Sequence, residues 1–161
     1  MSQRPHPHPP ASVATPGDIR DVWARRAHGW EKWEPLLTSA LAAVDPALFR
    51  GLALDPDSYV VDFACGTGEP SLTLARLLRR GRVLGVDIAE PMLEIARRRA
   101  RRNGVRNVTF RQGDLSRYRH RGRPAAAAIS RFGLMFVDDV PAALQDETIC
   151  KDCYAKEMLN A

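Results

Sequence analysis

The chain has 161 residues, enough for one domain, and its 24 basic and 19 acidic side chains give a formal net charge of +5 at pH 7. No apolar run approaches the roughly 18 residues that a membrane span needs, and the N-terminal residues lack the apolar region of a secretory signal, so a cytoplasmic location is expected. Three cysteines give no disulfide framework.

The first 17 residues predict a disordered arm. They are rich in Pro, His, Ser and Ala, a composition that cannot build a core. His6 and His8 could contact a metal, but no other ligand is near them in the sequence. The expectation is therefore a solvated arm with no metal site.

Residues 18–54 predict a helical region. Apolar residues recur at steps of three and four from Asp18, and Pro35 and Pro46 are placed to open a second and a third helix. The tryptophans of the first helix are Trp23, Trp30 and Trp33. They either pack this helix against other helices or belong to a lid that excludes water from a bound ligand.

The stretch from Tyr59 to Asp87 predicts a strand, a turn, a helix over residues 70–80 and a second strand. Gly66 and Gly68 allow a tight turn and let a ligand approach the backbone without meeting a Cβ atom. At the end of the second strand, the Asp87 carboxylate could accept hydrogen bonds from the two hydroxyls of a ribose. The unit therefore predicts a site for an adenosine ligand.

The charge around the glycine turn distinguishes between adenosine ligands. A dinucleotide fingerprint would have a third glycine where Ser71 stands, and Asp62 and Glu69 place carboxylates at the turn. Carboxylates repel a pyrophosphate and attract the sulfonium and ammonium groups of S-adenosylmethionine. The sequence thus favours this methyl donor, and a nicotinamide-dependent oxidoreductase is the weaker alternative. Cys65, inside the turn, is expected to be a small packed side chain.

The next helix is expected from Pro91 to Gly104. Five arginines crowd its second half, and they could form a basic patch for RNA. No aromatic residues interleave with them, so base stacking is not supported and a solvated helix face is expected. These arginines are Arg97, Arg98, Arg99, Arg101 and Arg102.

Two further strands are expected, over residues 108–110 and 125–130, with a polar loop over residues 117–123 between them. Ser130 and Arg131 emerge at the carboxyl end of the last strand, the edge where open α/β sheets bind ligands. The large apolar residues that follow are expected in the core; they are Phe132, Met135 and Phe136.

Four segments resemble the successive motifs of class I S-adenosylmethionine-dependent methyltransferases, above all the branch of the ubiquinone and menaquinone biosynthesis C-methylases. They are VDFACGTG (61–68), GVDIAEPML (85–93), FRQGDL (110–115) and ISRFGLMF (129–136). The resemblance covers about residues 58–144. It implies an α/β Rossmann-like methyltransferase fold, with a partial parallel sheet of strand order 3-2-1-4, helices on both faces and an N-terminal helical lid.

The resemblance also implies a donor site. Gly66 and Gly68 would line the amino-acid end of S-adenosylmethionine, Asp62 would order the turn and reach the ammonium, and Asp87 would hold the ribose. The adenine would lie between Ile88 and Met92, with Asp114 and Leu115 beside its amino group. The expected cofactor-binding residues are Asp62, Ala64, Gly66, Gly68, Asp87, Ile88, Met92, Gly113, Asp114, Leu115 and Ser130.

The acceptor site is less defined. By the same resemblance Ser130 and Arg131 would shape it, and the lid would bring Trp30 and Trp33 near it. No residue is a convincing general base, so the catalytic residues stay unassigned; His28 and His120 are the weak candidates. The branch suggests a small, hydrophobic or ring-bearing acceptor, and nucleic acid is not the expected partner.

The last 17 residues change in composition. They hold none of the 21 arginines but two of the three cysteines, and their net charge is −2. Cys150 and Cys153 make half a metal site at most, and a helix from Pro141 into this tail is the simpler expectation. Because a complete methyltransferase of this class resembles a seven-stranded sheet, the chain reads as a truncated form. Its fourth strand would then leave an exposed edge through which the chain could self-associate.

Two functional hypotheses follow. The first is a methyltransferase that binds S-adenosylmethionine and methylates a small molecule. The second is a non-catalytic donor-binding or interaction module that needs a partner chain. The domains expected are the arm (1–17), the helical lid (18–54), the donor-binding half domain (55–144) and the atypical tail (145–161).

Overall fold

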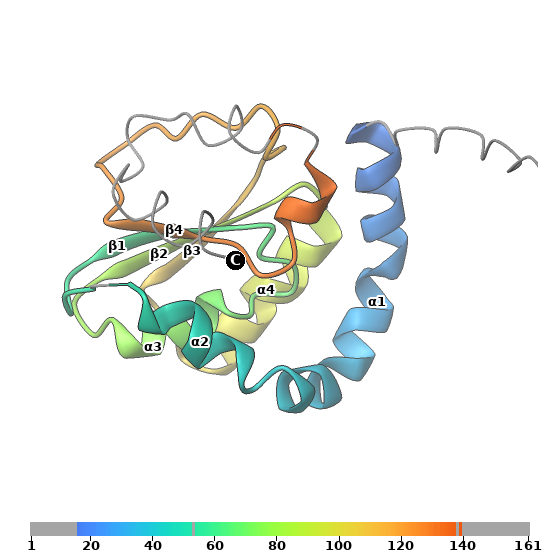
Figure 1. Ribbon diagram of the computed structural model, residues 1–161. Coiled ribbons are helices and arrows are strands. Elements are labelled where there is room, and N and C mark those ends of the chain that lie inside the picture. The colour runs from blue at the N-terminus through green and yellow to red at the C-terminus, as the bar shows by residue number, and fades with distance from the viewer. Residues whose placement is uncertain (1–15, 53, 138, 140–161) are drawn as a thin grey trace, which may run out of the picture.

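The computed structural model describes residues 16–52, 54–137 and 139, which form an α/β fold on a parallel sheet (Figure 1). The strands are β1 (Tyr59–Phe63), β2 (Arg82–Asp87), β3 (Val108–Gln112) and β4 (Ala127–Ile129). Their order is β3-β2-β1-β4, which confirms the predicted order. Since all pairs are parallel, the carboxyl ends of the strands share one edge of the sheet.

Side chains of the central strand β1 alternate between two apolar clusters, because successive residues of a strand point to opposite faces. Val60 packs in the cluster that contains residues of α3 (Ser71–Leu77) and α4 (Glu90–Arg102). Val61 and Phe63 pack in the other cluster, with side chains from the segment 115–125. Within the described residues, the α-helices therefore cover one face of the sheet and this segment covers the other.

The helix α3 ends at Leu77, three residues before the predicted end. The side-chain amide of Asn107 donates hydrogen bonds to the carbonyls of Ala75 and Leu78, both at 2.8 Å, and of Gly81 at 3.2 Å. The bonds to Ala75 and Leu78 replace the helical partners that these two carbonyls lack at the end of α3. A residue just before β3 thus terminates α3, which no local pattern indicates.

The helix α1 (Pro16–Ala40) runs through Pro35 without a break, so the expected second helix at this proline is wrong. A helix loses one backbone hydrogen bond at an internal proline. Two glutamates on the preceding turn, Glu31 and Glu34, form ion pairs with arginines of α4, and these hold the part of α1 before Pro35 against its neighbour. The helix expected at Pro46 is present as α2 (Val44–Arg50).

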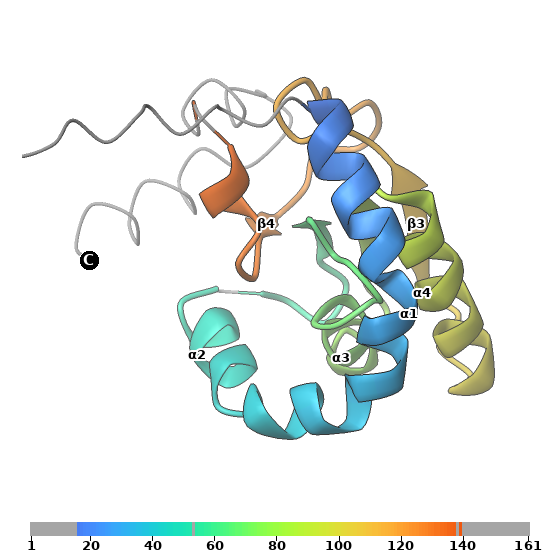
Figure 2. The ribbon, with the colours of Figure 1, turned by 90° about the vertical axis from the view of Figure 1, so that its right-hand side faces the viewer.

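The long helix α1 lies along α4, on the side away from the sheet (Figures 1 and 2). Ala27 of α1 is buried in a cluster with Met92 and Ile95 of α4, and Trp23 and Trp30 pack against this cluster. None of the described helices has the length and apolar character that crossing a membrane requires. The expected arm before residue 16, the helix at Pro141 and the two tail cysteines lie outside the described residues.

Candidate cofactor site

A pocket of about 570 Å³ opens at the carboxyl edge of the sheet, within the range of about 300–1,000 Å³ that is usual for small-molecule sites. Its walls come from the turn after β1, the ends of β2 and β3, the segment after β4 and the helix α1. The position agrees with the general rule for open parallel sheets, whose ligands bind outside the carboxyl ends of the strands.

Eight of the eleven residues expected to bind the cofactor line this pocket. They are Ala64, Gly66, Asp87, Ile88, Met92, Gly113, Asp114 and Leu115. They come from three separate motifs, and the parallel pairing of β1 with β2 and of β2 with β3 brings these motifs together. The sheet thus assembles most of the expected site at one edge.

Three of the expected residues do not line the pocket. Asp62 is fully buried, and its Oδ2 accepts a hydrogen bond from the hydroxyl of Ser71. Gly68 faces α4, where an added Cβ atom would lie 3.1 Å from the Cβ of Ala96. Ser130 donates its hydroxyl to the carbonyl of Phe63 at 2.9 Å. These three residues lie behind the pocket wall, so they support its shape without lining the pocket.

Asp87 fastens the glycine turn to the end of β2. Its Oδ2 accepts a hydrogen bond from the backbone N–H of Gly66 at 2.8 Å, and its Oδ1 accepts one from Ala89 at 2.9 Å. Burial raises the pKa of this carboxyl, and the backbone N–H donors act in the opposite direction. Because the Gly66 N–H is bonded to a carboxylate, the turn presents an acidic surface where a dinucleotide site would present free donors to a pyrophosphate.

Asp62 is the most perturbed acid of the site. Its burial raises the pKa to about 7, and Asp87 adds to the rise, whereas the Ser71 hydroxyl and Arg131 lower it. Its Oδ1 has no hydrogen-bond partner among the described residues. Cys65, beside it in the turn, is fully packed, and burial raises the pKa of its thiol, which confirms a packing role for this side chain.

The turn after β3 is closely packed. The backbone N–H of Gly113 donates to the carbonyl of Asp87 at 2.9 Å, and a Cβ atom at Gly113 would lie 2.7 Å from the ring of Tyr118. Asp114 accepts hydrogen bonds from the backbone N–H of Ser116 at 3.0 Å and from its hydroxyl at 2.6 Å. These contacts fix the Asp114 carboxylate at the pocket wall.

The opposite wall of the pocket is apolar and aromatic. Its large side chains are Ile19, Trp23, Trp30, Leu41, Phe132, Met135 and Phe136. The Trp23 ring meets Phe136 edge-on at 5.5 Å and lies 6.0 Å from Trp30. The core placement expected for Phe132, Met135 and Phe136 is wrong, since they are 46–71% exposed and face the pocket.

Of the tryptophans of α1, Trp23 and Trp30 line the pocket and Trp33 does not. Trp33 is 55% exposed and does not line the pocket, although it was expected near the acceptor. Trp23, seven residues before Trp30, lines the pocket instead, and this spacing of two helical turns was the signal for a shared face. Gly133 and Thr67 also line the pocket; both lie within the motifs 129–136 and 61–68, but neither was expected to bind the cofactor.

Neither candidate general base lies at the pocket. His28 is exposed on α1. His120 is 5% exposed, with its ring 5.5 Å from that of Tyr59, and its Nε2 lies 3.1 Å from the carbonyl oxygen of Arg123. Among the described residues, no cluster of three or more His, Cys, Asp or Glu side chains could hold a metal ion.

The arginines of α4 are not a uniformly solvated face, as the sequence had predicted. Arg99 is 5% exposed, and Arg97 pairs with Glu90 and donates to the carbonyl of Phe110 at 3.1 Å. Arg98 pairs with Glu31, while Arg101 and Arg102 are exposed. Three of these five arginines therefore make tertiary contacts.

A parallel α/β sheet with a glycine turn after β1, an acidic residue at the end of β2 and a pocket at the carboxyl edge defines the class of Rossmann-like nucleotide-binding proteins. Residues 60–148 match the family model described as the methyltransferase domain. The chain belongs to this methyltransferase domain family, as its motifs had indicated.

Similar proteins are methyltransferases with different acceptors in their names. The chain is 45% identical over 75 residues to the 23S rRNA (uracil(1939)-C(5))-methyltransferase RlmD of Alkalilimnicola ehrlichii, covering 47% of this chain and 16% of that protein. It is 24% identical over 132 residues to the demethylmenaquinone methyltransferase of Lactobacillus johnsonii, covering 80% of this chain and 54% of that one. The chain thus spans about half of the latter protein and a smaller part of the former.

A solved structure has the same fold. The SAM-dependent methyltransferase of Geobacter sulfurreducens, crystallised in complex with S-adenosyl-L-homocysteine, is 29% identical, with a TM-score of 0.52. The match covers 62% of this chain and 39% of that one. The sheet and the pocket-forming turns fall in a fold that other methyltransferases use.

Proposed function

We propose that the chain binds S-adenosylmethionine in the pocket and promotes methyl transfer to a small apolar acceptor. One observation carries the proposal: the described residues that line the pocket include four acidic ones, Glu69, Asp87, Asp114 and Asp139, but only one basic one, Arg131. The whole chain carries a net charge of +5, so this acidity is local. A cationic ligand fits such a wall, whereas a phosphate-bearing one is repelled.

Different residues would contact different parts of the donor. Asp87 would accept hydrogen bonds from the ribose hydroxyls, since each of its oxygens has a second acceptor position beyond the one its backbone donor occupies. Ile88 and Met92 would flank the adenine, and Asp114 would bind its amino group. Asp62 and Gly68 would act through the shape of the turn. The likeness to a methyltransferase crystallised with S-adenosylhomocysteine supports this assignment.

When bound, S-adenosylmethionine supplies an electrophilic methyl group on a positively charged sulfur. The chain contributes the positions of the two reactants. The glycine turn and Asp87 would hold the methyl donor, and the aromatic wall of Trp23, Trp30 and Phe136 would hold the acceptor and exclude water. Holding two reactants in near-attack geometry can lower a barrier by roughly 7–11 kcal/mol. A transfer of this kind does not require a general base in the pocket when the acceptor atom is already nucleophilic.

The aromatic wall supports a flat, apolar or ring-bearing acceptor. Aromatic side chains favour stacked and edge-on contacts with other rings, and a relative named demethylmenaquinone methyltransferase is in line with this class. Another relative is named as a 23S rRNA methyltransferase, so RNA is the alternative acceptor to test. The proposal includes a cytoplasmic location. The free thiol of Cys65 is compatible with the reducing conditions there.

Calorimetric titration of S-adenosylhomocysteine tests the donor site. We expect Asp87→Ala to weaken binding at least about tenfold, because each lost bond to a charged group is worth about 1.5–3 kcal/mol. Asp21→Ala, which removes an exposed carboxylate from α1, is the control for net charge and should bind as wild type does. Equal affinities of Asp87→Ala and wild type would remove the ribose assignment.

A second candidate is a non-catalytic donor-binding module, favoured by the position of the two candidate bases, His28 and His120, away from the described pocket. Assays with labelled donor against pools of quinols, small amines and RNA separate the two. Methylated product in the quinol pool supports the first proposal, and product in the RNA pool alone overturns the small acceptor. Donor binding without product in any pool favours the module.

A further inference from the structure

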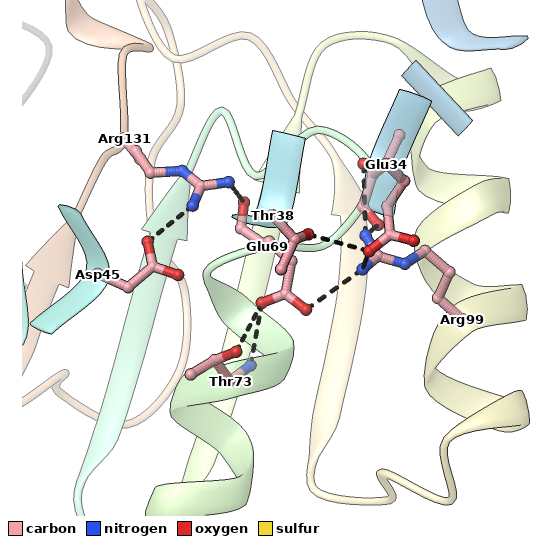
Figure 3. A network of polar contacts seen from close by, with 8 residues as sticks. Glu34, Thr38, Asp45, Glu69, Thr73, Arg99 and Arg131 are labelled. Atoms are coloured by element: carbon pink, nitrogen blue, oxygen red, sulfur yellow. Dashed lines mark hydrogen bonds and ion pairs between the residues drawn. The ribbon is translucent and has the colours of Figure 1, made fainter. Parts of the chain in front are cut away.

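Arg99 joins the helix α1 to the glycine turn (Figure 3). Its side chain is 6% exposed, and its guanidinium donates at 2.8 Å to the backbone carbonyl of Thr67, which stands between the two glycines of the turn. The same group pairs with Glu34 of α1 at 2.6 Å and with Glu69 at 3.3 Å. One buried cation thus holds the long helix, the turn backbone and the residue after the turn.

Glu69 continues this connection to the rest of the pocket. Its side chain accepts hydrogen bonds from the backbone N–H of Thr73 at 3.3 Å and from its hydroxyl at 2.9 Å, in the first turn of α3. Its backbone carbonyl accepts from Arg131 at 3.1 Å, and Arg131 pairs with Asp45 of α2 at 2.7 Å. Helices α1 to α4 and the end of β4 are therefore joined around the glycine turn (Figure 3).

A second ion pair between α1 and α4 has a different character. Arg98 and Glu31 lie 2.8 Å apart, but their side chains are 49% and 39% exposed. Exposed pairs contribute little and are screened by salt, whereas the 6% exposed guanidinium of Arg99 is shielded from solvent. The two pairs link the same helices, and only the buried one also touches the turn.

We propose that Arg99 is a positioning residue, which through Glu34 couples the closure of α1 over the pocket to the shape of the glycine turn and hence to donor affinity. The inference rests on the proposed donor site. Planar guanidinium groups hold several acceptors in fixed directions, so the Thr67 carbonyl keeps its place while α1 is docked. When Glu34 no longer pairs, α1 loosens and the turn loses one of its fixed contacts.

The experiment compares Glu34→Gln with Glu31→Gln. Both changes remove one negative charge from α1 and one ion pair to α4, and Arg99 keeps Thr67 and Glu69 as partners, so the fold is retained. We expect Glu34→Gln to raise the dissociation constant of S-adenosylhomocysteine about tenfold, in the range of measured couplings between sites. Glu31→Gln should change it less than about twofold.

Hydrogen exchange in the ligand-free protein gives a readout that simple anchoring of α1 would not move. We expect faster exchange at the Gly68 amide, which donates to the Cys65 carbonyl within the turn, in Glu34→Gln but not in Glu31→Gln. A loss of protection confined to α1 would overturn the proposal, as would equal affinities of the two variants. Arg99→Lys keeps the charge without the planar fork, and it should behave as Glu34→Gln does.

The two proposals fail separately. If wild type does not bind S-adenosylhomocysteine, the donor site is refuted, and exchange at Gly68 still tests whether α1 and the turn are coupled. If wild type binds and Glu34→Gln binds equally well with unchanged exchange, the donor site stands and the positioning role of Arg99 falls.

Discussion

The two walls of the pocket are built in different ways. The donor wall consists of turns at the ends of β1, β2 and β3, and backbone hydrogen bonds from Gly66 and Gly113 to Asp87 fix these turns to one another. The opposite wall consists of aromatic side chains from α1 and from residues 132–137, which meet through ring contacts. Backbone hydrogen bonds to the sheet thus fix most of the first wall, whereas the second depends on the packing of side chains.

The largest expected effect concerns the buried acid behind the donor wall. With the pKa of Asp62 raised to about 7 from 3.8, the folded state keeps a proton that the unfolded state loses as the pH rises above about 4. The free energy of unfolding is therefore highest below about pH 4, where Asp62 is protonated in both states. It falls by up to about 4 kcal/mol as the pH rises from about 4 to about 7. Asp62→Asn cannot titrate and should lack this fall.

Urea unfolding at about pH 4.5 and about pH 7.5 measures the difference between wild type and Asp62→Asn. Asp21→Asn, at an exposed carboxylate, serves as the control and should follow wild type. The same pH dependence in Asp62→Asn and wild type would mean that the donor wall does not depend on this carboxyl.

The next effect is at the junction of the two walls. A Cβ atom at Gly133 would lie 2.3 Å from the Cβ of Ala64 and 2.7 Å from the hydroxyl oxygen of Ser130. Gly133 has a φ of −86°, so the obstacle is contact and not backbone strain. We expect Gly133→Ala to lower the free energy of unfolding by about 3 kcal/mol, at the upper end of the usual overpacking cost.

Gly29→Ala is the matched control for that substitution. Beyond the surrounding backbone of α1, no atom lies within 4 Å of the added Cβ, and alanine favours a helix over glycine by about 1 kcal/mol, so α1 should become more stable. Thermal unfolding of both variants measures the contrast. A Gly133→Ala protein as stable as wild type would show that the two walls can separate freely.

The smallest effect concerns the aromatic wall alone. Phe136→Ala removes the edge-on contact with Trp23, and such contacts are worth about 0.5–1.5 kcal/mol. We expect binding of a flat apolar probe, 1,4-naphthoquinone, to weaken about fivefold, while S-adenosylhomocysteine affinity stays within about threefold. Quenching of tryptophan fluorescence measures the first and calorimetry the second.

Leu36→Ala is the control for the aromatic wall, since Leu36 is 62% exposed and does not line the pocket. A large loss of S-adenosylhomocysteine affinity in Phe136→Ala would contradict the division of the pocket into two walls. Unchanged probe binding would remove the aromatic wall from the acceptor site.

The parts of the site that follow a strand directly were the predictable ones. The apolar runs of β1 and β2 and the glycines between them indicated where the turn and Asp87 would lie, and the pocket contains both. The contacts of Arg99 were not predictable, because its partners Glu34 and Thr67 are 65 and 32 residues away in the chain. The arginine run around it looks the same whether a member is exposed or buried.

Sequence alone determined the glycine turn and the acidic residue after β2, because each depends on a local pattern that any parallel sheet brings to one edge. The strand order and the family followed from the resemblance of four motifs to those of known methyltransferases. Only the tertiary structure decided that α1 continues through Pro35, that Trp23 rather than Trp33 reaches the pocket and that Phe136 faces it. These outcomes depend on which side chains of distant elements meet, and ion pairs and ring contacts across such distances leave no periodic signal in the chain.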